Sequence, residues 1–161
     1  MEYPLYYIVK TSMAQPTLEI ILAKLVEQRQ YIEHIRDTKN EKSRKIELAL
    51  KGPLKELGFL HSVTNRVYPL FGPESQFEVD FYCPNRRIAI EVERSNLYTK
   101  VWLALFKMLE SNHIDHAMIM VPIQRIVRNS PENSYELTYK RIRDNAINLL
   151  GRLDTLVIVG Y

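Results

Sequence analysis

Two stretches of alternating apolar and polar residues, joined by a turn, constrain the fold of this chain more than any other feature. They are residues 76–82 (QFEVDFY) and 87–93 (RIAIEVE), and each has a large apolar residue at every second position. Because successive side chains of a strand point to opposite faces, each stretch predicts a strand with one apolar and one polar face. The intervening Pro84-Asn85-Arg86 is a turn signal, so the sequence predicts a β-hairpin.

Helices and fully buried strands are predicted on the C-terminal side of this hairpin. Residues 97–111 and 135–150 carry apolar residues at spacings of three and four, which indicates helices. Residues 117–121 (AMIMV) and 156–159 (LVIV) are continuous apolar runs, which are typical of strands buried on both faces. The chain is therefore expected to continue as helix, strand, helix and strand.

The residues before the hairpin are predicted to be mainly helical. Apolar spacing predicts helices over residues 16–36 and 41–57, with Gly52-Pro53 kinking or splitting the second. Short β-rich segments predict further strands, the first of them at a sheet edge: residues 3–10, 59–64 and 66–70. This order of elements is typical of an α/β sandwich with a mixed sheet.

The composition excludes several classes of protein. The 161 residues are 46% hydrophobic and 25% charged, which excludes a disordered chain and allows one well-packed core. The single cysteine, Cys83, excludes an intramolecular disulfide and a cysteine-built zinc site, and it fits the cytoplasm. No apolar run reaches the roughly 20 residues of a membrane span, and residues 1–10 do not resemble a secretory signal. We therefore expect a cytoplasmic protein that does not associate with membranes.

The polar faces of the two hairpin strands are acidic. If Asn85 and Arg86 form a two-residue loop, Asp80 lies opposite Glu91, and Glu78 lies opposite Glu93. Like charges directly opposite each other destabilise a strand pair, and a bound divalent cation would remove the repulsion. Carboxylate oxygens are suitable ligands for Mg²⁺ or Mn²⁺. The alternative is an acidic face exposed to solvent, without a ligand.

This pattern resembles the PD-(D/E)xK nuclease superfamily, whose motif is an Asp on one strand and an acid and a lysine two residues apart on the next. Asp80 matches the first acid and Glu91 the second, while Glu93 stands where most members have lysine, and Val79 where the motif has proline. The BamHI and BglII branch of type II restriction endonucleases has Glu or Gln at the lysine position. The segment from 88 to 122, with a helix that carries Phe106 and Lys107, resembles that branch.

The resemblance implies a restriction-endonuclease-like three-layer sandwich, in which a mixed β-sheet is flanked by helices. It also implies one nuclease-like domain over residues 1–161. Residues 1–38 would form an N-terminal strand and helix arm, and residues 41–161 an αβββαβ core followed by a helix and a strand. The arm would dock a second subunit or cover the sheet.

The implied chemistry is hydrolysis of phosphodiester bonds in double-stranded DNA with Mg²⁺, for which Mn²⁺ could substitute. Asp80, Glu91 and Glu93 would hold the metal, and Glu93 could instead orient the attacking water as a general base. Glu47 matches a catalytic glutamate that many members carry on the helix before the core; the alternative is a solvated helix residue. Without the motif lysine, the metal would supply most of the positive charge at the transition state. Cutting both strands of a symmetric site implies a homodimer.

Two groups of residues are candidates for DNA contact. Arg94, Ser95, Asn96 and Lys100 directly follow the second acidic strand, at the expected mouth of the site. A second basic group includes Arg125, Arg128 and Arg141, although a solvated basic helix face is equally consistent with the modest net charge of +3. Two further functions stay open on the sequence: a nuclease that acts on junctions or repair intermediates, and a non-catalytic DNA-binding module.

Overall fold

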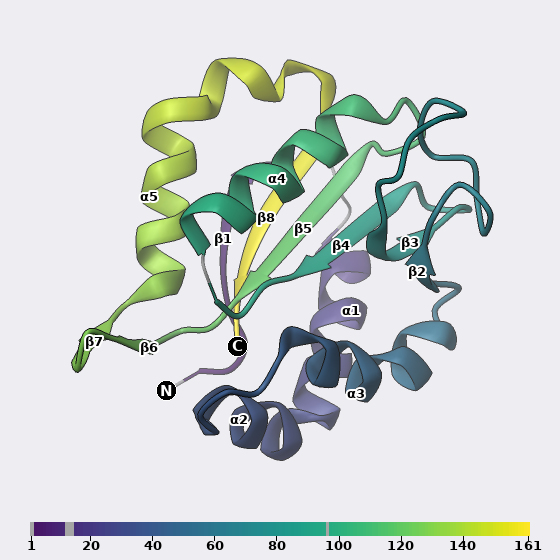
Figure 1. Cartoon of the computed structure of the whole chain (residues 1–161). Coiled ribbons are helices and arrows are strands. Elements are labelled where there is room, and N and C mark those ends of the chain that lie inside the picture. The colour runs from purple at the N-terminus through teal and green to yellow at the C-terminus, as the bar shows by residue number, and fades with distance from the viewer. Residues whose placement is uncertain (1, 12–14, 96) are drawn as a thin grey trace.

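The computed structural model describes residues 2–11, 15–95 and 97–161, and these residues form a six-stranded mixed sheet between two layers of helices (Figure 1). The predicted three-layer α/β sandwich is therefore confirmed. From one edge to the other, the strands are β1 (Leu5–Lys10), β8 (Thr155–Gly160), β5 (His116–Val121), β4 (Ile88–Val92), β3 (Val79–Cys83) and β2 (Leu60–Val63). β4, β5 and β8 are parallel to one another, whereas the remaining neighbours pair antiparallel.

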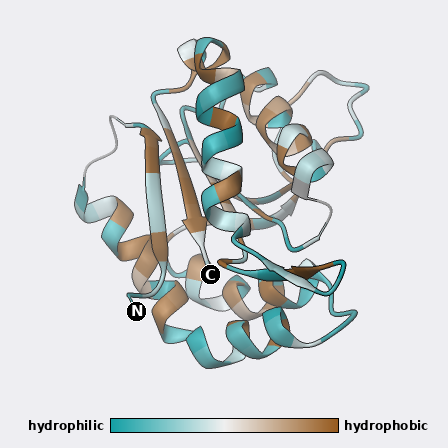
Figure 2. Ribbon diagram, turned by 90° about the vertical axis from the view of Figure 1, so that its left-hand side faces the viewer, coloured by the Kyte–Doolittle hydropathy of each residue, from teal (hydrophilic) through white to brown (hydrophobic). Residues whose placement is uncertain are grey.

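Helices cover both faces of the sheet. One layer consists of α1 (Gln15–Glu27), α2 (Arg29–Asp37) and α3 (Ser43–Lys55). The other consists of α4 (Leu97–Glu110) and α5 (Ser134–Ala146), and a 3-10 helix, η1 (Ile147–Arg152), follows α5. Figure 2 shows predominantly hydrophobic strands between helices that carry hydrophilic residues. No helix in the described ranges is long and apolar enough to cross a bilayer.

The alternation of β4 divides the core into two parts. Ile88, Ile90 and Val92 pack toward α1–α3, while Ala89 packs toward α4 and α5. Since neighbouring residues point to opposite faces, Glu91 shares the face of Ala89 and lies beneath α4. The acidic residue of this strand therefore faces a helix layer and not solvent.

The hairpin has the predicted register but a longer connection. Cys83 pairs with Ile88, and the ladder continues to Phe81 and Ile90, as a loop centred on Asn85 and Arg86 requires. The turn nevertheless spans residues 84–87, so the prediction of a two-residue loop was wrong. The backbone of Arg87 is in the left-handed conformation (φ 54°), and its carbonyl accepts hydrogen bonds from the backbone N–H groups of Asp115 and His116. The carbonyl of Arg87 therefore bonds to the start of β5, and Pro84 and Arg87 do not form a further pair of the hairpin ladder.

Two other segments differ from the predictions. The expected helix over residues 16–36 is interrupted at Gln28, which allows α1 and α2 to pack separately on α3. The strand predicted over residues 66–70 is absent from this described segment, which instead belongs to a loop. Asn65 holds that loop, because its amide donates to the carbonyls of Phe71 and Gly72 and its oxygen accepts from Phe71 N. An amide that bonds backbone groups in this way competes with a β-ladder.

A small second sheet, which was not predicted, is formed by the residues that follow β5 and precede α5 in the sequence. It is a hairpin of β6 (Arg125–Val127) and β7 (Ser130–Glu132), and it projects from the body of the molecule in Figure 1. Its strands of three residues are too short to show a period in the sequence.

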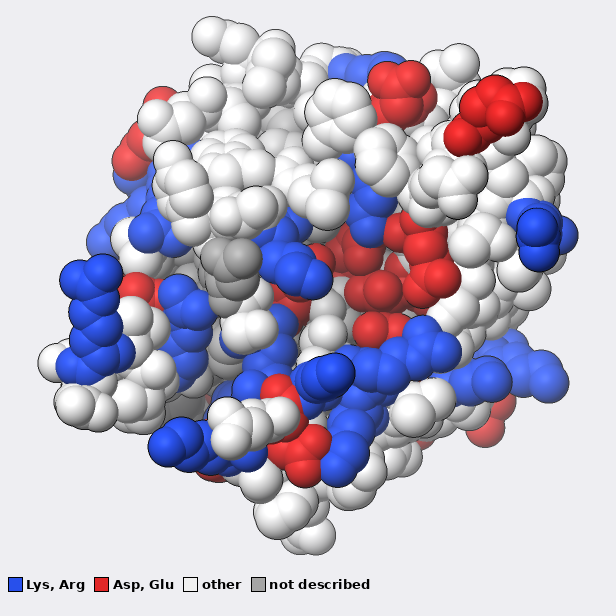
Figure 3. Space-filling view, viewed as in Figure 1, with Lys and Arg blue, Asp and Glu red and all other residues white. Residues whose placement is uncertain are grey.

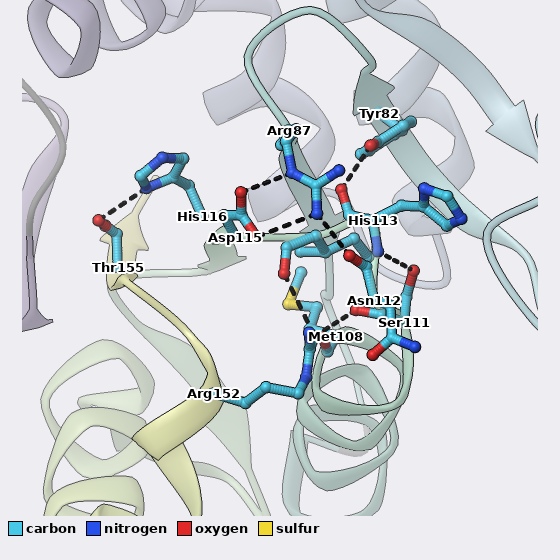
Figure 4. Close-up of polar contacts among 11 residues, drawn as sticks. Tyr82, Arg87, Met108, Ser111, Asn112, His113, Asp115, His116, Arg152 and Thr155 are labelled. Carbon is cyan, nitrogen blue, oxygen red and sulfur yellow. Dashed lines mark hydrogen bonds and ion pairs between the residues drawn. The ribbon is translucent and has the colours of Figure 1, made fainter.

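Two arginines fix the end of α4 and the connection to β5 (Figure 4). Arg87 Nε lies 2.5 Å from Asp115 Oδ2, and the same guanidinium donates to the carbonyl of Asn112. Arg152 donates to the carbonyls of Met108 (2.8 Å), Leu109 (2.6 Å), Ile114 (3.2 Å) and also Ser111. The last carbonyls of a helix have no partners within it, so Arg152 acts as the C-terminal cap of α4.

Replacing Arg152 by Ala should lower the free energy of unfolding by about 1–3 kcal/mol, because several of these carbonyls lose a charged donor. The measurement is urea denaturation followed by circular dichroism. Arg143→Ala is the matched control, since Arg143 is exposed and pairs with its neighbour Asp144 at the surface. Equal effects of the two substitutions would contradict the role assigned to Arg152.

Candidate active site at the end of β3 and β4

Four carboxylates gather where β3 and β4 separate. Asp80 is the second residue of β3, Glu91 is in β4, Glu93 follows that strand, and Glu47 comes from α3. The charge of Asp80 raises the pKa of each of the other three, which places Asp80 at the electrostatic centre of the group. Figure 3 shows acidic side chains in a hollow of this face, bordered by lysines and arginines. The structure thus brings the four predicted catalytic residues together.

Glu91 is the most deeply buried of these acids. Its residue is 1% exposed, and burial, followed by the charge of Asp80, raises the pKa of its carboxyl well above the usual range. Lys107 of α4 opposes this shift through an ion pair between its ammonium and Glu91 Oε1. The alternative of a solvated acidic face is therefore wrong for Glu91. A buried carboxylate of this kind is stable only with a compensating positive charge.

Lys107 is the functional candidate that the motif did not indicate. Its ammonium also donates to the carbonyl of Glu78 at 2.6 Å, so it spans the edge of β3 and the buried acid of β4. The expectation of a site without a lysine is thereby corrected. The sequence does contain a weak signal, because Lys107 lies three residues after the apolar Ala104 and directly before the apolar Met108. A cation beside the apolar stripe of a helix faces the edge of the sheet.

Asp80 is held in place by the neighbouring strand. Its Oδ2 accepts a hydrogen bond of 2.7 Å from the backbone N–H of Val92. The carboxylate thus bonds to β4 at the point where the two strands separate. Glu78 and Glu93, predicted to face each other across the hairpin, both lie just outside the strands. Burial and the charge of Asp80 raise the pKa of Glu93 to about 7, while Lys100 lowers it.

Glu47 reaches the site from the opposite helix layer and is 5% exposed, so it is not a solvated helix residue. Its Oε2 lies 3.0 Å from His61 Nε2 and 3.2 Å from Arg44 Nη1. Burial, followed by the charge of Asp80, raises the pKa of Glu47 to about 7. Burial also lowers the pKa of His61. Neither partner was predicted: Arg44 lies one turn before Glu47 on α3, and His61 comes from β2, which meets α3 only in the folded chain.

The predicted DNA-contact residues separate into different environments. Arg94 donates to the carbonyls of Arg36 (3.1 Å), Thr38 and Glu41 (2.6 Å), so its guanidinium is used inside the protein to hold the turn between α2 and α3. Ser95 and Lys100 are exposed beside the acids, and Asn96 lies outside the described residues.

The second predicted basic group is divided as well. Arg125 and Arg128 belong to the β6–β7 hairpin, and Arg125 Nε pairs with Glu132 at 3.0 Å. Arg141 lies between α4 and α5, with its guanidinium 5.2 Å from the ring centre of Tyr98. The structure therefore does not bring Arg141 into contact with the acidic group.

The donor set is chemically suited to Mg²⁺ or Mn²⁺, because all its members are carboxylate oxygens. Two of the raised pKa values, those of Glu47 and Glu93, lie near neutrality, so a cation would compete with protons for the site. Glu91 Oε1 is buried and has no hydrogen bond, only the Lys107 ion pair. Within the described residues, however, no group of three or more His, Cys, Asp or Glu side chains is arranged to hold a metal ion.

Stability should depend on the ionisation of Glu93. Its pKa is about 7 in the folded protein and about 4.5 when unperturbed, so the folded state binds more protons between these values. The free energy of unfolding should therefore fall as the pH rises from about 4.5 to about 7. Glu93→Gln removes this contribution and should stabilise the metal-free protein at pH 8 by about 1–2 kcal/mol. Urea denaturation in chelator, from pH 5 to pH 8, measures the difference.

Glu110→Gln is the control for this titration, since Glu110 is exposed at the end of α4. It should follow the wild-type profile. A Glu93→Gln profile parallel to that of the wild type would show that Glu93 titrates normally.

Comparison with known proteins places these features in a family. A family model described as "Putative halobacteria restriction endonuclease" matches residues 2–161. Comparisons with curated proteins and with solved structures gave no match. The family description supports a nuclease role, and the match includes every residue of the acidic group. The chain belongs to this restriction endonuclease family.

Proposed function

We propose that this protein is a metal-dependent endonuclease that hydrolyses phosphodiester bonds in double-stranded DNA as part of a restriction system. The observation that carries the proposal is the convergence of Asp80, Glu91, Glu93, Glu47 and Lys107 at one end of the sheet. In sheets with parallel strands, functional groups gather at the carboxyl ends of those strands, and Glu91 and Glu93 lie at that end of β4. The family match supports nuclease chemistry and DNA as the partner.

Asp80, Glu91 and Glu93 would hold Mg²⁺, with Mn²⁺ as a possible substitute, as in the PD-(D/E)xK pattern that they resemble. A bound divalent cation supplies Lewis-acid polarisation of the phosphate and makes nearby water more acidic. Asp80 keeps its orientation through the Val92 N–H, so one ligand oxygen is positioned by the backbone before any cation binds. Such positioning reduces the reorganisation needed in the reaction.

The raised pKa values of Glu93 and Glu47 suit these carboxyls to proton transfer near neutral pH. A general base works best when its pKa lies near the working pH, and both residues have a pKa of about 7. Glu93, which directly follows the ligand strand, would complete the ligand set or would instead act as the general base. Glu47, bonded to His61 and Arg44, holds the opposite side of the site.

Lys107 would supply the positive charge that the motif places two residues after the second acid. Its ammonium already lies against Glu91 in an ion pair. A fixed cation beside the scissile phosphate stabilises the charge that develops during hydrolysis. We also propose a homodimer, because cleavage of both strands of a symmetric site requires two active sites.

The decisive test of the proposed function compares the wild type with Asp80→Asn on supercoiled plasmid DNA, with Mg²⁺, with Mn²⁺ and with chelator. We expect discrete fragments from the wild type with metal and no cleavage by the variant, because one ligand is lost. Asp144→Asn, the same change at an exposed site on α5, should cleave normally. In parallel, Mg²⁺ should raise the melting temperature of the wild type above pH 7 and leave that of Asp80→Asn unchanged.

The alternatives correspond to different outcomes. Cleavage of branched DNA alone would identify a structure-specific nuclease, and DNA binding without cleavage a binding module. Equal cleavage by the wild type and Asp80→Asn would contradict the assigned site.

Lys107→Met should reduce the cleavage rate about 10²- to 10³-fold, the usual effect of removing one charge-stabilising group. Because this change leaves Glu91 buried without its partner, unfolding must be measured as well. Lys107→Arg retains the charge and should restore part of the rate. If Lys107→Met is folded and cleaves at the wild-type rate, Lys107 has only a structural role.

A further inference from the structure

A pocket of about 700 Å³ adjoins the acidic group on the side of the β6–β7 hairpin. One wall is the end of α2 and the start of the turn to α3, within residues 36–40, and the other lies within residues 122–129. Arg94 and Ser95, which directly follow Glu93, lie between them. The segment that carries Glu93 therefore continues directly into the lining of this pocket.

The pocket carries an excess of positive charge, with five cations and one carboxylate among its lining residues. Three of the cations are already used: Arg94 bonds backbone carbonyls, Arg36 pairs with Asp37, and Arg125 pairs with Glu132. Among the described residues, Lys39 and Arg128 make no ion pair, and both are exposed. They lie on opposite walls, so each wall presents one available cation to an anionic ligand.

The hairpin is built as a rigid projection. Arg125 pairs with Glu132 and Val127 with Ser130, which leaves Arg128 and Asn129 as a two-residue turn. Both turn residues are left-handed, with φ of 50° and 65°, as a type I′ turn requires. The Arg125–Glu132 ion pair joins the base of the two strands. The two side chains at the tip are therefore presented from a fixed backbone.

The residue types on the hairpin match the chemistry of base edges. The guanidinium of an arginine can donate two hydrogen bonds to guanine, and the amide of an asparagine can bond adenine in the same way. The major groove of DNA is wide enough for a two-stranded ribbon. Ile126, which is 72% exposed on the same hairpin, offers an apolar contact of the kind that thymine methyl groups make.

We infer that the β6–β7 hairpin is the element that reads the DNA sequence. Arg128 and Asn129 contact base edges in the major groove, and Lys39 on the opposite wall contacts a phosphate of the same duplex. Arg94 is a positioning residue, since it fixes the turn that carries Lys39. The inference deepens the proposed function, on which it depends for DNA as the ligand class.

The test measures binding of the full chain to a pool of DNA duplexes with a randomised centre, in chelator to prevent cleavage. The double variant Arg128→Asn/Asn129→Gly keeps residues that tolerate positive φ, so the turn is retained. Arg86→Asn is the control, since Arg86 is an exposed arginine in the turn at the other end of β4. The wild type and Arg86→Asn should select the same preferred sequence.

The double variant should lose that preference and bind the wild-type site at least about 10-fold more weakly. Lys39→Ala should weaken binding to all sequences alike. It should also reduce, by about one, the slope of the logarithm of the binding constant against the logarithm of the salt concentration. Selection of the same sequence with the same affinity by the double variant would overturn the inference, and so would a wild type that binds no duplex.

Cleavage distinguishes this result from failure of the proposed function. If the wild type cleaves and the double variant cuts the same sites at the same rate, the hairpin is not the reading element although the endonuclease assignment stands. If the wild type does not cleave, but its sequence preference depends on Arg128 and Asn129, the inference stands and the endonuclease assignment fails.

Discussion

The ion pair between Lys107 and the buried Glu91 connects the fold to the site. β4 lies in the middle of the sheet, where a carboxylate without a partner would strongly destabilise the protein. Packing α4 over this face brings an ammonium to Glu91 and at the same time closes the hydrophobic core around Ala89 and Met108. The arginine cap at the end of α4 fixes the helix along its axis, and with it the position of Lys107. The charge balance of the site therefore depends on the packing of a whole helix layer.

The sequence predicted the strands of the site better than their surroundings. A period of two and the turn at Pro84-Asn85-Arg86 were sufficient for the hairpin register, which placed Asp80 and Glu91 on neighbouring strands. The same period cannot show whether the polar face meets solvent or a helix, because that depends on a segment more than ten residues away. Lys107 was missed as the counterion of Glu91 for this reason. His61 was missed because it meets Glu47 only through the packing of α3 against β2.

Charged residues in a sequence also do not indicate how their charge is used. Arg94 follows the acidic strand and was expected at the DNA, yet its guanidinium bonds three carbonyls of a turn more than 50 residues earlier in the chain. Arg141 packs on Tyr98. Backbone carbonyls leave no trace in a residue pattern, so an arginine that satisfies them cannot be distinguished in the sequence from one that is free. Arg128, by contrast, is exposed on a hairpin whose short strands gave no periodic signal.

The site draws on both helix layers, and this has a consequence for how it can work. Glu47 reaches Asp80 from the α3 side of the sheet, whereas Lys107 approaches from the α4 side. The two groups can meet only where β3 and β4 have separated and the sheet no longer divides the layers. Asp80 marks that point, because its carboxylate bonds Val92 N where the ladder ends. Since β4 and β5 are parallel, β5 leads into the β6–β7 hairpin from the same end of the sheet at which Glu91 and Glu93 lie, as the proposed contact of the hairpin with the DNA requires.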